Sequence, residues 1–158
     1  MKSIKTFLEN HPLFDGLDQE AVHLFSACAD EASFSPGEPI YRQGDEADRF
    51  YILCSGEATL EAESPGRGRI VIETLSAGDV LGASWLFPPY RLMWDARARS
   101  RIQAVGFNAR CLRQTCDENP HLGYLLMKRF AQIMIHRMQA ARLQSLDIYA
   151  PPVKGGKP

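Results

Sequence analysis

The sequence predicts a mainly β domain with flanking helices: an antiparallel, jelly-roll-like β-roll, with short helices before it and one long helix after it. Three observations predict this fold. The spacing of apolar residues changes from three or four to two near residue 31. Short strand-like segments then follow one another between glycine-containing turns as far as residue 107. After Pro120 a long apolar stripe with helical spacing takes over.

The N-terminal segment, residues 4–28, is predicted to form two helices. Apolar residues from Ile4 to His11 recur with a helical period, and Pro12 stops the first helix. Asp18 can cap the second, because its side chain can accept a hydrogen bond from the first turn. The expected buried face of this second helix consists of Ala21, Val22, Phe25 and Cys28.

The roll is expected over residues 31–107. Its strand-like segments are short, rich in β-branched or aromatic residues and bounded by turn residues; they are 31–35, 39–42, 50–54, 57–63, 69–75 and 96–107. Gly37, Gly44, Gly56 and Gly78 occupy the turns, where a positive φ angle favours glycine. In the last segment small apolar residues alternate with Arg97, Arg99 and Arg101, so the arginines are expected on the outer, solvated face.

Helices are expected again over residues 108–149. Asn108 can cap a short helix, and Pro120 opens a long one that ends near Tyr149. Residues of its apolar stripe recur almost every four positions, and Leu126, Phe130, Met134 and Met138 are predicted to form the face of a crossing pair of helices with a second copy of the chain. The roll is expected to cover the first half of this stripe, so that the part from Met134 on is exposed in a monomer. The alternative is a helix that folds back wholly onto its own roll. We expect one domain over residues 1–150 and a disordered tail at 151–158. Apart from Val153, the tail consists of Gly, Lys and Pro.

Length and composition place the chain among ordinary globular domains. It has 158 residues, 45% of them hydrophobic and 23% charged, and a net charge of −1. Residues 1–79 carry six Lys and Arg against fifteen Asp and Glu, whereas residues 80–158 carry twelve against four. The basic half could attract an anionic ligand or nucleic acid, but we expect the two halves to fold together so that their fields largely cancel. No signal peptide or membrane span is recognisable, so a cytoplasmic location is expected.

Cysteine and histidine spacing gives no metal site. None of Cys28, Cys54, Cys111 and Cys116 forms a Cys-x-x-Cys pair. Cys28 and Cys54 are expected to be small core residues. The four histidines show no ligand spacing either. No metal or other cofactor can be named with certainty, and the open candidates are a cyclic nucleotide or an apolar or aromatic small molecule.

Five short motifs in order give the chain a family resemblance. They are Phe14-Asp15-Gly16-Leu17, Ser35-Pro36-Gly37-Glu38, Tyr41-Arg42-Gln43-Gly44-Asp45, Phe50-Tyr51-Ile52-Leu53-Cys54-Ser55-Gly56 and Leu75-Ser76-Ala77-Gly78-Asp79-Val80-Leu81-Gly82. Together with the order of elements they resemble the cyclic nucleotide-binding domain family, of the catabolite activator-like β-roll type, over roughly residues 7–146. The resemblance implies a ligand site between the strands and a cassette after Gly82 that holds a cyclic phosphate.

This cassette departs from the family pattern. The resemblance implies a Glu that accepts a hydrogen bond from ribose and an Arg that pairs with phosphate; Ala83 and Leu92 stand at these positions, and Arg91 lies one residue off register. Ser84 could replace part of the role of the Glu, and its expected local role is a helix cap. The candidate ligand residues are Gly82, Ala83, Ser84, Trp85, Arg91, Leu92, Met93 and Trp94. Three interpretations stay open: a cassette filled by its own side chains, an apolar or aromatic ligand, or a weakly bound cyclic nucleotide.

The sequence therefore predicts a non-catalytic regulatory module that binds a small ligand in the roll and signals through its C-terminal helix. The alternative is an interaction or dimerisation module with a vestigial, self-filled pocket. No Gly-x-Ser-x-Gly, P-loop or metal box indicates an enzyme. Only about ten residues follow the long helix, so no helix-turn-helix domain and no direct DNA binding are expected. The expected partners are a second copy of the chain and an unidentified protein.

Overall fold

The computed structural model describes residues 3–149, with side chains as far as Leu143. The chain begins with α1 (Ile4–Asn10), the 3-10 turn η1 (Pro12–Phe14) and α2 (Gln19–Ala27). The side chain of Asp18 accepts a hydrogen bond from the amide of Ala21, as the sequence predicts for a helix cap. The predicted disordered tail, 151–158, lies outside the described residues.

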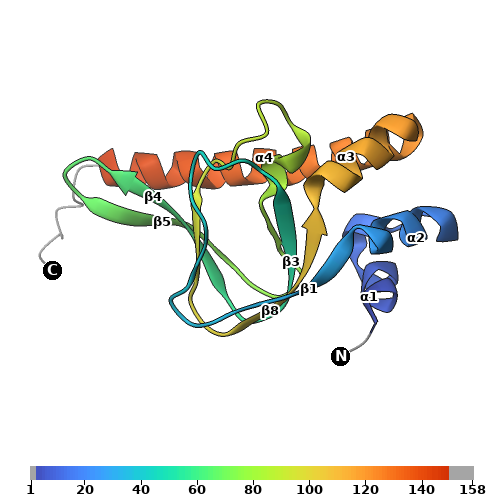
Figure 1. Ribbon diagram of the computed structural model, residues 1–158. Helices are drawn as coiled ribbons and strands as arrows, with labels where there is room; N and C mark the ends of the chain where they lie inside the picture. The colour runs from blue at the N-terminus through green and yellow to red at the C-terminus, as the bar shows by residue number, and fades with distance from the viewer. Residues whose placement is uncertain (1–2, 150–158) are drawn as a thin grey trace, which may run out of the picture.

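Eight antiparallel strands form the roll (Figure 1), so the predicted fold class is confirmed. They are β1 (Ala29–Phe34), β2 (Pro39–Tyr41), β3 (Arg49–Ser55), β4 (Ala58–Ser64), β5 (Gly68–Leu75), β6 (Val80–Leu81), β7 (Asp95–Ala98) and β8 (Ile102–Asn108). One sheet has the order β1-β8-β3-β6 and the other β2-β7-β4-β5. Between β6 and β7 lies a second 3-10 turn, η2 (Ala83–Leu86).

The predicted last strand, 96–107, is in fact two strands in different sheets. β7 pairs with β4, whereas β8 pairs with β1 and β3, and the chain changes sheet at Arg99–Arg101. Gly56 packs against this corner so closely that a Cβ atom there would lie 2.2 Å from the carbonyl oxygen of Arg101. The alternation of small apolar residues continues across the corner because both strands face the same interior, and sequence periodicity alone cannot reveal the break.

Two further helices close the roll. α3 (Ala109–Glu118) is capped by Asn108, whose side chain accepts a hydrogen bond from the amide of Cys111. α4 (Pro120–Tyr149) then runs across the top of the roll in Figure 1 and packs against η2 and β5. The bounds of α4 are those that the sequence predicts.

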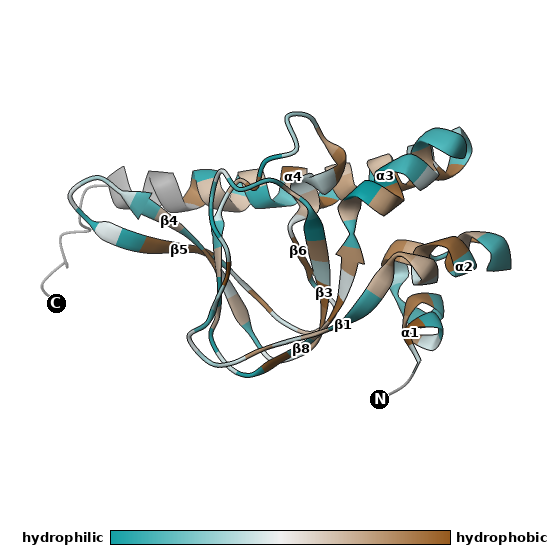
Figure 2. Cartoon of the chain, viewed as in Figure 1, coloured by the Kyte–Doolittle hydropathy of each residue, from teal (hydrophilic) through white to brown (hydrophobic). Residues whose placement is uncertain are grey.

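The buried side chains form two adjoining clusters. One lies between the two sheets and includes Leu53, Leu60 and Ile102. The other lies under the helices and contains the largest buried aromatic residues, among them Phe50 and Trp85. Figure 2 shows hydrophobic positions on the strands and along α4. The turn η2, which follows β6, is buried within the cluster under the helices.

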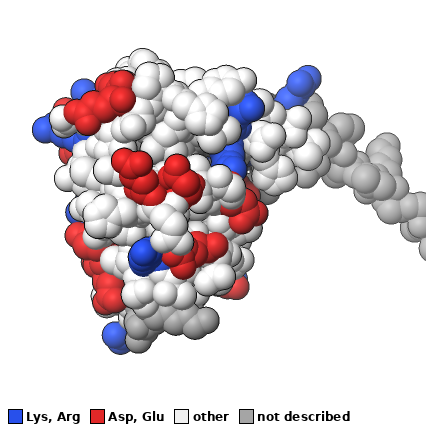
Figure 3. Space-filling view, turned by 90° about the vertical axis from the view of Figure 1, so that its right-hand side faces the viewer, with Lys and Arg blue, Asp and Glu red and all other residues white. Residues whose placement is uncertain are grey.

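Ion pairs join the acidic N-terminal half of the chain to the basic C-terminal half. Arg97 lies 3.5 Å from Glu61, Arg99 lies 4.0 Å from Glu57, and Arg110 pairs with Glu46. Arg97 of β7 and Arg99 of the following corner thus lie beside acidic residues on the outside of the roll. On the face shown in Figure 3, acidic and basic side chains form small separate groups and neither sign forms one continuous patch.

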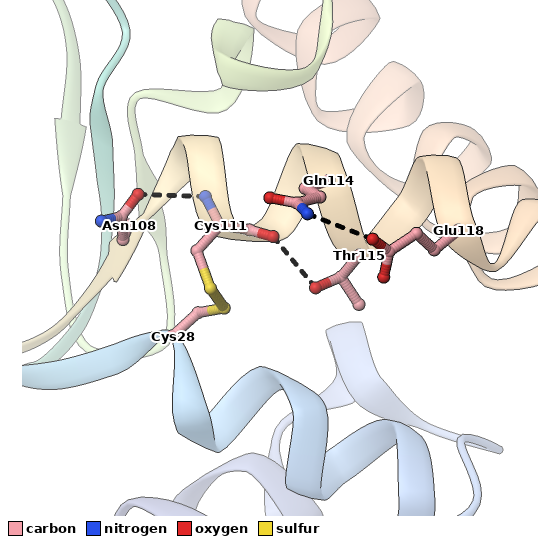
Figure 4. The surroundings of a disulfide bond; sticks show 6 residues. All are labelled: Cys28, Asn108, Cys111, Gln114, Thr115 and Glu118. Atoms are coloured by element: carbon pink, nitrogen blue, oxygen red, sulfur yellow. Dashed lines mark hydrogen bonds between the residues drawn. A yellow bond between two sulfur atoms is a disulfide. The ribbon is translucent and has the colours of Figure 1, made fainter.

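Cys28 is buried in the core as the sequence predicts, and it also forms a disulfide bond that the sequence did not predict. Cys28, at the end of α2, is bonded to Cys111 in the first turn of α3, with 5.9 Å between the Cα atoms (Figure 4). Cys54 and Cys116 are free. The two bonded residues are 83 positions apart in the chain, so no local spacing could predict the pairing. The bond fastens the N-terminal helices to the helix that leads into α4.

Candidate functional site

The cassette begins with a conformation that favours glycine. Gly82 has a φ angle of +86°, and a Cβ atom there would lie 3.2 Å from the carbonyl oxygen of Arg49. The turn η2 follows directly and all four of its residues are buried. A single 3-10 turn is shorter than a helix that could direct several free amide groups at a phosphate.

Trp85 occupies the interior beneath this turn. Its ring is completely buried, stacks on Phe50 with 4.7 Å between centroids, and meets Phe130 of α4 edge to face at 5.3 Å. The indole nitrogen is buried and has no hydrogen-bond partner within the described part of the chain. Trp85 is therefore part of the hydrophobic core, and it joins the cassette to both β3 and α4.

Polar contacts hold the cassette loop against α3. The guanidinium of Arg113 donates hydrogen bonds to the carbonyl oxygens of Trp85, at 2.6 Å, and Ala47, at 3.3 Å. The same group lies over the ring of Tyr90, 4.6 Å from its centroid. Ser84 does not cap the turn as predicted. Instead its hydroxyl donates to the carbonyl oxygen of Arg91, at 2.9 Å, and closes the loop.

Little space remains where the family resemblance implies a ligand. The cavity between the cassette and α4 has a volume of about 10 Å³. It is lined by six of the predicted residues and three others: Gly82, Ala83, Ser84, Leu92, Met93 and Trp94, with Tyr41, Met134 and Arg137. A volume of this order holds at most one water molecule.

Arg91 lies outside this cavity. Its side chain is exposed, and its Nη1 atom lies 3.5 Å from the carbonyl oxygen of Gly44. It lines a separate surface cavity of about 180 Å³ together with Glu46, Arg110 and Arg113. The structure therefore places the side chain of Arg91 away from the small cassette cavity, although its carbonyl oxygen accepts the hydrogen bond from Ser84.

Sequence reasoning missed two residues that line the cassette. Tyr41 belongs to β2, and burial raises the pKa of its phenol to about 12, although the charge of Arg137 and the amide of Gly82 oppose the shift. Arg137 belongs to α4 and is 7% exposed; burial lowers the pKa of its guanidinium. One signal could have revealed Arg137: it follows Phe130 and Ile133 at helical spacing, as a charged residue within the apolar stripe.

The predicted dimer residues fall into two groups. Leu126 and Phe130 are buried in the core of the chain itself. Met134 is partly buried, whereas Met138 is 58% exposed. The exposed part of the predicted dimer face therefore lies in the second half of α4.

The part of the chain that the structure describes has neither a membrane-spanning helix nor a cluster of metal ligands. No helix in residues 3–149 is long and apolar enough to cross a membrane. Within the same part of the chain, no group of three or more His, Cys, Asp or Glu side chains is arranged to hold a metal ion.

Comparison with known proteins defines the class of domain. The sequence model described as the cyclic nucleotide-binding domain matches residues 31–119, more than half of the chain. The chain therefore belongs to the cyclic nucleotide-binding domain family. A CRP-like cAMP-activated global transcriptional regulator of Mycobacterium tuberculosis is 21% identical over 143 residues, which cover 90% of this chain and 62% of that protein. The chain thus spans less than two thirds of that relative.

Solved structures agree with the assignment. A protein of Geobacter metallireducens assigned to the cyclic nucleotide-binding proteins is 26% identical, with a TM-score of 0.77 over 87% of this chain and 99% of that one. A cyclic nucleotide-binding domain from Methylobacillus flagellatus has a TM-score of 0.76 at 17% identity. The match covers 96% of this chain and 85% of the Methylobacillus chain. The second likeness shows the fold alone.

Proposed function

We propose that this chain is a non-catalytic regulatory module of the cyclic nucleotide-binding domain family whose cassette is filled by its own side chains. In this proposal α4 transmits the regulatory state by contact with a second copy of the chain and with a protein partner. The observation that carries it is the cavity of about 10 Å³ at the cassette, since small-molecule sites usually measure about 300–1,000 Å³. This volume favours a self-filled cassette over a ligand held between the sheets.

The residues at the cassette support the same conclusion. Ala83 offers no carboxylate to a ribose hydroxyl and Leu92 offers no charge to a phosphate. Each loss is expected to cost about 1–3 kcal/mol, which together lowers affinity by about a hundredfold or more. Trp85 strengthens the argument, because a ligand that displaced its ring would break its contacts with Phe50 and Phe130.

Calorimetric titration with cyclic AMP and cyclic GMP tests this proposal. We expect no binding with a low-micromolar dissociation constant, while the cAMP-activated regulator of M. tuberculosis serves as the positive control. Low-micromolar binding of either nucleotide would overturn the self-filled cassette. An Arg91→Ala variant then locates the phosphate: loss of binding would place it near Arg91, and unchanged binding would place it elsewhere.

The exposed face of α4 supports pairing with a second copy. Tyr124, Met127, Ala131, Met134 and Met138 follow one another at spacings of three and four, which is a heptad pattern. Tyr124, Met127 and Met138 are exposed, as is the neighbouring Ile135. A heptad face favours two helices wrapped along one another, in place of the crossing pair that the four-residue spacing of Leu126 and Phe130 predicts.

A further inference from the structure

A cavity of about 670 Å³ lies apart from the cassette, between η1, the β5–β6 corner and α4. Its volume is in the usual range for a small-molecule site. Its apolar wall consists of Pro12, Leu13, Leu75, Ala77, Val80 and Ile133. Its polar wall combines Glu73 and Asp79 with Arg129, Gln132, His136 and Arg137, and His11 closes one side.

Several of the polar groups in the wall are already occupied. The ring of His11 contacts the carbonyl oxygen of Gly78 through Nε2, at 2.7 Å, and accepts from the amide of Leu13 through Nδ1. Arg129 donates to the carbonyl oxygens of Leu13 and Asp15. The carboxylate of Asp79 accepts from the amide of Ser76, at 2.9 Å. These contacts hold the wall in place, so the cavity is built by η1 and the corner together.

The donors of Arg137 are only partly used. Its guanidinium donates to the carbonyl oxygen of Val80, the one hydrogen bond it makes among the described residues. Its Nε atom forms an ion pair with Oε2 of Glu73 at 3.6 Å, which is beyond hydrogen-bond distance, and that oxygen is buried without a hydrogen-bond partner in the described part of the chain. A guanidinium carries five N–H donors in a planar fork, so most of them remain unused in a largely buried position.

The charges in the wall limit the kind of ligand. Arg129 and Arg137 balance Glu73 and Asp79, so the cavity tolerates one added negative charge better than the two of a phosphate monoester. A carboxylate matches the planar fork of a guanidinium with two parallel hydrogen bonds. The apolar wall beside it suits a hydrocarbon body.

We propose that this cavity binds a small amphipathic carboxylate, with the carboxylate on Arg137 and the apolar body against Pro12, Ala77 and Ile133. This site goes beyond the proposed function and needs neither an open cassette nor a dimer. Arg137 also lines the small cassette cavity. Occupancy of the larger cavity would therefore act on the contact between α4 and β6, and through it on the position of the helix.

Titration of the full chain with octanoate, followed by amide chemical shifts, tests this site. Octan-1-ol is the matched neutral probe, Arg137→Gln removes the proposed anchor, and Arg142→Gln is the control on the exposed side of the same helix. We expect octanoate to shift the amides of Leu13, Gly78 and Ile133. The affinity should fall about tenfold or more for octan-1-ol and for Arg137→Gln, but not for Arg142→Gln.

Three outcomes would overturn the proposal. They are no shift at millimolar octanoate, equal affinity for the acid and the alcohol, and shifts confined to Gly82–Trp94. Arg137→Gln could fail to fold because the side chain is buried, and Ile133→Trp then decides, since it fills the cavity and leaves Arg137 in place. Octanoate binding unchanged in a folded Ile133→Trp variant would also refute the site. The cyclic nucleotide titration has no bearing on these outcomes, so the two proposals fail separately.

Discussion

Single side chains account for the closed state of the cassette. Trp85 fills the space beneath η2, and Leu92 and Met134 contribute apolar surface to what remains. The sequence showed the unusual aromatic content of this segment but left open whether the rings face a ligand or the core. The contact of Trp85 with Phe130, 45 residues later in the chain, resolves its own position, because it depends on how α4 packs.

The two tryptophans should differ in their accessibility to a quencher and in their contribution to the free energy of unfolding. Trp85 is completely buried, whereas Trp94 is partly buried at the edge of the inter-sheet cluster. We expect acrylamide to quench a Trp94→Phe variant, which retains only Trp85, much less than a Trp85→Phe variant. Trp85→Ala should lower the free energy of unfolding by about 3–5 kcal/mol, and Trp94→Ala by less than half of that. Equal quenching and equal losses would contradict the assignment of Trp85 to the core.

The phenol of Tyr41 should lose its proton only at high pH, and its ionisation should destabilise the fold there. Its pKa of about 12 in the folded chain exceeds the ordinary value of 10.0, so folding favours the neutral phenol. The stabilisation is complete below pH 10 and is lost as the pH rises towards 12. Absorbance at 295 nm should show that Tyr41→Phe removes a late step from the titration. The variant should also lose less stability than the wild type between pH 10 and 12, and a late step that persists in it would refute this origin.

At the scale of elements, local signals predicted the helices better than the corners of the roll. Asp18 and Asn108 mark helix starts through hydrogen bonds to their own first turns, and Pro120 marks one because its fixed φ angle suits the first helical position. β6 has only two residues, too few for a period, and the break between β7 and β8 leaves the alternation intact. These features are set by pairing between distant strands, so one sequence does not reveal them.

The disulfide should contribute strongly to stability, because it closes a long loop. Cys28 and Cys111 are 83 residues apart, for which loop closure predicts a contribution of at most ~4.5 kcal/mol. Urea unfolding of the double variant Cys28→Ser/Cys111→Ser should show a loss approaching this value, and Cys54→Ser, which removes a free thiol, is the control.

A thiol count shows whether the bond forms in the cytoplasmic setting that the sequence predicts, where reductants oppose it. Protein unfolded without reductant should expose the two thiols of Cys54 and Cys116, and all four cysteines after reduction. Four thiols before reduction would show that Cys28 and Cys111 remain unpaired in cells.

At the scale of the molecule, α4 contacts the cassette, the larger cavity and the core of the roll. Phe130 packs on Trp85, Arg137 borders both the cassette and the larger cavity, and the opposite side carries exposed apolar residues. The sequence predicted the helix and an apolar stripe that is covered by the roll in its first half and exposed from Met134 on, and the burial of Leu126 and Phe130 agrees with this. It did not predict that Arg137 is buried beside the stripe, because that depends on the angle at which α4 crosses the sheets.

The exposed side of α4 leads to a prediction about assembly. If Tyr124, Met127 and Met138 pair with a second copy, light scattering at micromolar concentration should give about twice 17.7 kDa. Met138→Glu places a charge in the seam and should give a folded monomer. Val71→Glu is the matched control, because Val71 is also an exposed apolar residue but lies on β5. Phe130→Ala should instead destabilise each monomer by about 3–5 kcal/mol, since the ring is buried in its own core. A wild-type monomer, or a dimer that persists in Met138→Glu, would show that this face has another role.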